Sequence, residues 1–80
     1  MKAIVHVGLK PVVLDPQGRA ISRSLVDLGF DEVKGARQGK IIELDIKEKD
    51  ADRAKTRVTE MCEKLLANTV IESYHIEIES

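Results

Sequence analysis

The order in which apolar patterns follow one another limits the possible folds of this chain more than any other feature. Within 80 residues, a strand, a helix and a strand are followed by the same three elements again. Isoleucine and valine mark the strands, and apolar residues three and four positions apart mark the helices. The predicted strands span residues 3–9, 31–37, 41–47 and 70–79, and the predicted helices span residues 16–28 and 51–67. This order predicts a single α+β domain over residues 1–80, with a ferredoxin-like βαββαβ fold in which two helices cover one face of a four-stranded antiparallel sheet.

The connection between the first strand and the first helix is predicted to hold one shape. Pro11 and Pro16 each fix φ at about −65° and remove an amide donor. Asp15 precedes Pro16, which suits a helix N-cap followed by proline at the first helical position. The loop is therefore expected to be stiff and to carry Lys10 and Gln17 outward.

Other helix ends and turns have equally local signals. Asp50 is expected to cap the second helix, while Gly29 and Asn68 follow the two helices and tolerate the left-handed conformation that ends a helix. Gln38 and Gly39 form a plausible turn between the second and third strands.

The uncovered sheet face carries the two histidines of the chain. In the expected strand order the first strand lies between the third and the fourth, so His6 and His75 become neighbours, with Glu43 or Asp45 close by. Two imidazoles and a carboxylate can serve as a transition-metal or acid–base set. Polar residues on a solvated or subunit-facing surface are the favoured interpretation, because no pair has a tight spacing such as H-x-x-x-H.

Composition excludes several classes of function. The net charge is −1 with acids and bases well mixed, and no aromatic residue is expected on the open sheet face, which argues against nucleic-acid binding. No apolar run approaches the roughly 20 residues needed to cross a bilayer. Cys62 is the only cysteine, which fits a reducing cytoplasm. A chain this short has a marginal core of its own, and oligomerisation is a common remedy.

Catalytic motifs are not found in the sequence. Cys62 lies on the apolar stripe of the second predicted helix, where a buried structural thiol is expected. No glycine-rich phosphate loop of a known pattern is present. The segment 35–40 places two glycines and two cations at a predicted hairpin tip, which could cradle an anion, although a tight turn is the favoured interpretation.

Six blocks of the sequence, including Leu-Asp-Pro-Gln-Gly at 14–18, form a recognisable series at residues 9–11, 14–18, 28–30, 37–40, 61–68 and 70–74. In this order they resemble the PurS family of small accessory subunits of phosphoribosylformylglycinamidine (FGAM) synthase. One departure is Ala36, where the family usually has a bulkier apolar residue.

The resemblance implies a non-catalytic scaffold in de novo purine biosynthesis. Such a subunit bridges a large ATP-dependent synthetase subunit and a glutaminase subunit for ammonia transfer, and it forms a homodimer or tetramer. This chain would have no active site, cofactor or metal of its own, while the complex, a ligase, uses ATP, Mg and glutamine. The candidate partner-binding residues are Lys10, Asp15, Gln17, Arg37, Lys40, Asn68, Glu72 and Tyr74.

Two alternative functions belong to other classes. A small-molecule-sensing regulatory module of ferredoxin-like fold would bind an effector between paired subunits near residues 11–18. A free-standing enzyme would use His6 and His75, and would show turnover or metal retention by the isolated chain.

Overall fold

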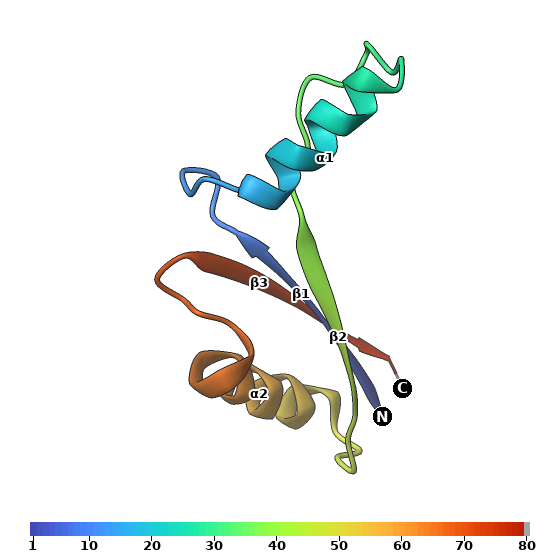
Figure 1. The fold of residues 1–80 in the computed structure, drawn as a ribbon. Helices are drawn as coiled ribbons and strands as arrows, with labels where there is room; N and C mark the ends of the chain where they lie inside the picture. Colours follow the sequence, from blue (N-terminus) through green and yellow to red (C-terminus); the bar gives the residue numbers. More distant parts are fainter. Residues whose placement is uncertain (80) are drawn as a thin grey trace.

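The computed structural model describes residues 1–79 and consists of one small sheet and two helices (Figure 1). The strands pair antiparallel in the order β2-β1-β3, so the first strand is central, as the sequence predicts. The elements are β1 (Lys2–Leu9), α1 (Pro16–Asp27), β2 (Gly39–Asp45), α2 (Ala51–Met61), a π-helical turn η1 (Cys62–Leu66) and β3 (Glu72–Glu79).

The sheet has three strands over the described residues, so the prediction of a four-stranded ferredoxin-like sheet is corrected. The predicted strand at 31–37 is an irregular segment that joins no ladder. Its end is bonded elsewhere: Arg37 binds carbonyls of the loop after β1, and the Gln38 amide binds Asp15. The chain then enters β2 directly at Gly39, so the predicted turn at Gln38 and Gly39 is also wrong.

Helix α2 packs against β1 and β3 and forms the core with them. Alternate residues of β1 point to this side, and the apolar stripe of α2 meets them. Tyr74, Ile76 and Ile78 of β3 pack around the same cluster, as their alternation predicts. The buried apolar side chains are Ala3, Val5, Val7, Ala54, Val58, Cys62 and Ala67.

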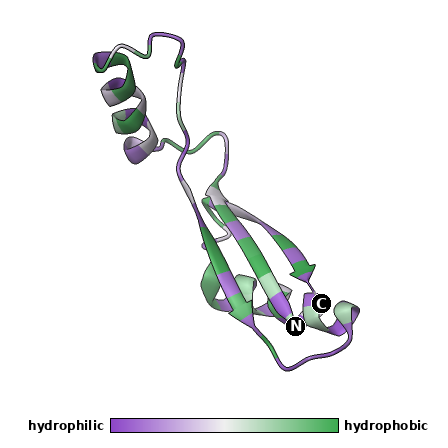
Figure 2. Cartoon of the chain, turned by 90° about the vertical axis from the view of Figure 1, so that its right-hand side faces the viewer, coloured by the Kyte–Doolittle hydropathy of each residue, from purple (hydrophilic) through white to green (hydrophobic). Residues whose placement is uncertain are grey.

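Helix α1 does not lie beside α2. It stands beyond the end of the sheet, joined to it by the loop after β1 and by the segment that leads into β2 (Figures 1 and 2). No substantial packing links α1 to the sheet or to α2 within residues 1–79. The prediction that both helices cover one sheet face is therefore wrong for α1.

The helix ends follow their local signals in three cases out of four. Asp15 and Asp50 cap α1 and α2, and Gly29 has φ 102°, as predicted. Asn68 does not adopt a left-handed conformation, because α2 passes into η1 and the chain is already extended at Ala67, with φ −130° and ψ 140°. The described part of the chain has no helix long and apolar enough to cross a membrane.

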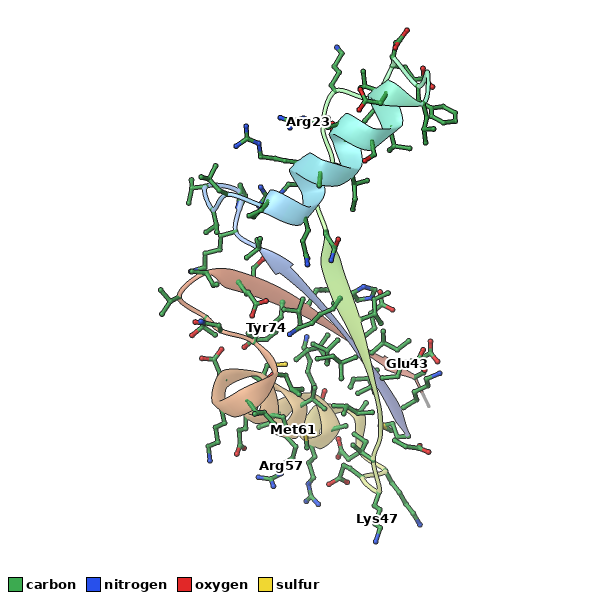
Figure 3. All side chains as sticks on the ribbon, in the orientation of Figure 1. Arg23, Glu43, Lys47, Arg57, Met61 and Tyr74 are labelled. Carbon is green, nitrogen blue, oxygen red and sulfur yellow. The ribbon has the colours of Figure 1, made fainter. Side chains whose placement is uncertain are left out.

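The hydroxyl of Tyr74 ties β3 to the turn η1, since it donates to Oε2 of Glu63 at 2.6 Å. Figure 3 shows Tyr74 between the sheet and α2. The bond to this carboxylate, followed by burial, raises the pKa of Tyr74 to about 12. The chain has one tyrosine and no tryptophan, so its tyrosinate absorbance reports this group alone.

We expect the tyrosinate absorbance of the folded protein to titrate with a midpoint of about 12, and Glu63→Gln to lower the midpoint toward the ordinary value of 10.0. A near-ultraviolet pH titration measures this, with circular dichroism confirming that the protein is folded at each pH. A midpoint near 10 in folded wild-type protein would contradict the hydrogen bond.

Candidate docking site

Asp15 joins two segments that are far apart in the sequence. One carboxylate oxygen accepts from the amide of Gly18 at 2.8 Å and so caps α1. The other accepts from the amide of Gln38 at 2.7 Å. The side chain is buried, and its bonds to Gln38 and Gly18 hold its pKa below the usual range. Asp15 therefore fastens the start of α1 to the chain that enters β2.

Arg37 reinforces the same connection from the opposite segment. Its guanidinium donates to the carbonyl oxygens of Val13 at 3.0 Å and of Lys10 at 2.9 Å, with a longer contact of 3.4 Å to that of Leu9. Arg37 is suited to this task because its planar fork of donors can satisfy several carbonyls at once. These bonds fix the shape of the loop after β1.

Two glycines allow the segments to approach each other. A Cβ at Gly18 would collide with the carbonyl oxygen of Ala36 and with the Asp15 carboxylate. At Gly39 a Cβ would collide with the carbonyl oxygen of Val7. We call residues 10–15 and 36–38 together the elbow, because their mutual bonds set the position of α1 relative to the sheet.

The elbow borders a hollow of about 220 Å³ that unites several predicted docking residues. Asp15, Gln17, Lys40 and Glu72 all line it, from the loop, α1, β2 and β3 respectively. Gln17 accepts a 2.6 Å hydrogen bond from the side chain of Gln38, which sequence reasoning had assigned only to a turn. The sequence thus predicted a set of residues that the fold brings together at the junction of sheet and helix.

The other predicted docking residues do not line this hollow. Lys10 is half-buried in the loop, and its amide donates to the carbonyl of Ile71 at 2.8 Å. Asn68 and Glu72 shape the turn before β3, where the Asn68 amide donates to the Glu72 carboxylate at 2.7 Å. Tyr74 lies farther along β3 and binds Glu63. The docking role of all eight residues stays a prediction.

The two histidines are neighbours on the uncovered sheet face, as predicted, but the carboxylate beside them is not the predicted Glu43 or Asp45. His6 and His75 are directly opposite in the ladder, with ring centroids 6.0 Å apart. Glu77 Oε1 lies 3.5 Å from His6 Nε2 and 3.9 Å from His75 Nε2. Glu43 instead pairs with Lys2 at 3.1 Å. Within residues 1–79, no group of three or more histidine, cysteine or acidic side chains is arranged so that it could hold a metal ion.

Apolar exposure around the elbow is a feature that the sequence analysis did not identify. Val12 and Leu14 in the loop, and Val70 in the turn before β3, are at least three-quarters exposed. The Lys10–Ile71 hydrogen bond ties this loop to this turn. Large apolar side chains gathered in this way on a surface indicate an interaction site.

Comparison of the sequence with known proteins identifies the family of this chain. The family model described as "PurS: Phosphoribosylformylglycinamidine (FGAM) synthase" matches residues 2–80. The chain belongs to the PurS family. The PurS subunit of FGAM synthase from Bacillus subtilis is 51% identical over 78 residues, which cover 98% of this chain and 92% of that protein.

Solved PurS structures have the same fold as this chain. The crystal structure of PurS from Methanocaldococcus jannaschii matches with a TM-score of 0.90 and 47% identity, covering 99% of this chain and 95% of that one. A chain in the structure of PurLQS from Thermotoga maritima matches with a TM-score of 0.87 and 34% identity, covering 95% and 93%. These matches favour a PurS subunit over a small-molecule-sensing regulatory module.

Asp15 substitutions test the elbow. Asp15→Ala loses both amide bonds, and we expect the melting temperature near neutral pH to fall by about 5–10 °C. Asp15→Asn keeps one acceptor oxygen, so its loss is expected to be about half as large. Thermal melts at one fixed protein concentration measure both changes.

The difference between wild type and Asp15→Asn is expected to depend on pH. The lowered pKa of Asp15 means that the carboxylate stabilises the fold above the ordinary value of 3.8, and that this stabilisation is lost as pH falls through the lowered value. Melts of the two proteins should therefore converge in acid. A gap of equal size at neutral and acid pH would contradict the role of the charged carboxylate.

Proposed function

We propose that this chain is the non-catalytic scaffold subunit of FGAM synthase in purine biosynthesis, and that it bridges the ATP-dependent synthetase subunit and the glutaminase subunit for ammonia transfer. ATP, Mg and glutamine are used by those subunits. The single observation that carries the proposal is the position of α1, which the elbow holds away from the sheet with its apolar side uncovered (Figures 1 and 2). A helix held in this way offers surface to other chains.

The apolar side of α1 and the segment that follows it favour contact with another chain. Ile21 is 41% exposed, Leu28 is 74% exposed and Phe30 is 48% exposed. In a monomeric domain an amphipathic helix buries its apolar stripe against its own core. Here the elbow prevents this, so the stripe must be covered from outside or remain in water.

The sheet offers a complementary surface. Helix α2 packs on β1 and β3, so the side chains of β2 on that face are covered from one flank only. Ile42 and Leu44, together with Ile46 just after the strand, are accordingly half-buried. In the predicted ferredoxin-like arrangement this flank would carry α1. A second copy could place its own α1 there, and the exchange would be reciprocal about a twofold axis. We therefore propose self-association, in which two copies complete each other's cores.

The proposal of a non-catalytic chain rests on how its reactive groups are used. Asp15 and Arg37 bind backbone groups of the elbow. The thiol of Cys62 is buried under α2, and burial raises its pKa, which disfavours the nucleophilic thiolate. Docking of the larger subunits is assigned to the exposed apolar loops around the elbow and to the adjoining residues Lys10, Lys40 and Asn68.

Removal of this chain from the complex tests the bridging role. We expect the chain to co-elute with its cognate synthetase and glutaminase in size exclusion with Mg-ADP and glutamine. We also expect omission of the chain to abolish FGAM formation from glutamine while leaving formation from added ammonium salt nearly unchanged. A chain that elutes alone under every condition, or full glutamine-dependent activity without it, would contradict the proposal.

Leu28→Lys tests self-association. The substitution removes one buried leucine at each of the two symmetry-related contacts, so it is expected to weaken the dimer by about 4 kcal/mol, or about a thousandfold in Kd, as measured by sedimentation equilibrium. The matched control is Thr56→Lys, which adds the same charge on the exposed side of α2. Wild type that is monomeric at the same concentrations, or equal dimerisation by all three proteins, would contradict the assignment.

A further inference from the structure

A basic groove runs along α1 on a side that the proposed self-association does not use. It has a volume of about 410 Å³ and lies between α1 and the segment that follows the helix. Arg19 and Arg23 line it from one wall and Lys34 from the other, with Asp27 as the only carboxylate. Figure 3 shows Arg23 on α1, far from the sheet. The lining residues thus carry three positive charges and one negative charge.

The three cations are uncompensated by side chains of the described residues. Within residues 1–79 none of them forms an ion pair or a side-chain hydrogen bond, whereas Lys2 and Arg57 do pair with glutamates. Arg37, next to the groove, is engaged with the elbow carbonyls and is not part of this set. Three uncompensated cations along one groove create a positive potential that attracts an acidic ligand.

The far wall of the groove adds free backbone groups. Over the described residues, the backbone amides and carbonyls of Lys34 and Gly35 make no hydrogen bond, while the carbonyl of Ala36 faces Gly18. Most backbone groups find partners in folded proteins, so an unbonded, non-helical stretch of this length is a template for an extended peptide. The groove floor includes Val26, which gives such a peptide an apolar contact.

The helical period separates this groove from the self-association surface. Arg19, Arg23 and Val26 recur at four and three positions and share one side of α1. Ile21 and Leu28 lie roughly 140–180° around the helix from that side, because successive residues advance by about 100°. A second copy on the apolar stripe leaves the groove open.

We propose that this groove receives an extended acidic segment of one of the larger subunits, with its carboxylates on Arg19, Arg23 and Lys34 and its backbone along Lys34 and Gly35. This inference rests on the proposed function, since it names the chemistry of one docking contact. Charge complementarity selects the occupant: a segment rich in Asp and Glu pairs with the cations, and the free backbone edge suits a protein chain better than a small anion.

Carbodiimide coupling of the assembled complex tests the proposal, because it joins an amine to a carboxylate only when the two are in contact. We expect mass spectrometry to find Lys34 joined to an Asp or Glu of the synthetase or glutaminase subunit, and Lys34→Gln to remove that product. A product that joins Lys34 only to a second copy of this chain would overturn the proposal.

Charge reversal provides the matching affinity measurement. R19E/R23E is expected to weaken assembly with the larger subunits at least about tenfold and to flatten its salt dependence, with self-association unchanged. The control R53E/R57E reverses two arginines with the same spacing on α2 and is expected to assemble as wild type does. Assembly of R19E/R23E equal to wild type would overturn the proposal. If R19E/R23E fails to fold, the Lys34 coupling result decides alone.

Two further readouts separate this proposal from its alternatives. Wild-type assembly is measured in the same experiment, so failure of wild type to assemble refutes the proposed function itself, whereas failure of the charge reversal alone refutes only the groove. Thermal melts of the isolated protein with inorganic phosphate and with ATP test for a small-anion site. Saturable stabilisation by either one that R19E/R23E abolishes would overturn the proposal in favour of that anion.

Discussion

The carboxylate of Asp15 decides where the first helix of this molecule lies. It is bonded at once to the amide of Gly18, at the start of α1, and to the amide of Gln38, at the entrance to β2. The guanidinium of Arg37 donates to backbone carbonyl oxygens of the loop after β1 and so fixes that loop. The bonds of Asp15 to Gln38 and of Arg37 to the loop cross 23 to 28 residues of sequence. They replace the strand pairing and helix packing that a ferredoxin-like domain would make in the same region.

Because α1 stands away from the sheet, apolar side chains remain exposed to water, and another chain could cover them. The core consists of small and medium side chains around Val5, Val58 and Cys62, while large apolar residues such as Leu28 and Val12 remain exposed. A domain of this size buries little apolar surface in its core, so large apolar side chains left in water reduce its stability noticeably. The exposed apolar side chains that lower the stability of the isolated chain are the surface through which the proposed scaffold subunit would contact other chains.

Much of this structure is predictable from local sequence. The alternation in β1 and β3, the Asp15 and Asp50 caps and the glycine end of α1 all depend on neighbouring residues, and each is confirmed. The predicted strand at 31–37 failed because an extended pattern does not reveal its hydrogen-bond partner. The carboxylate beside His6 is that of Glu77 and not of Glu43 or Asp45. The register places Glu43 and Glu77 alike opposite Ile4, and Glu43 turns to Lys2, a side-chain pairing that strand alternation does not reveal.

Four of the eight candidate docking residues lie together in the fold, and the docking role of all eight stays a prediction. Asp15, Gln17, Lys40 and Glu72 were selected from family blocks, and the fold gathers them around one hollow. The structural roles of Asp15 and Arg37 depend on contacts across the elbow that no local pattern encodes. The basic groove went unnoticed in the sequence, although the spacing of Arg19 and Arg23 was visible, because Lys34 reaches it only through the return of the chain along α1.

Cross-linking between α1 and β2 tests the central claim most directly. In a Cys62→Ala background, the variant Ile21→Cys/Leu44→Cys carries one thiol on each proposed contact surface, and a short bismaleimide can join them. If the elbow holds α1 away from its own sheet and a second copy covers it, the product is a covalent dimer joined from residue 21 of one chain to residue 44 of the other. A product joined only within a single chain would show that α1 folds back on its own sheet, and would contradict the account.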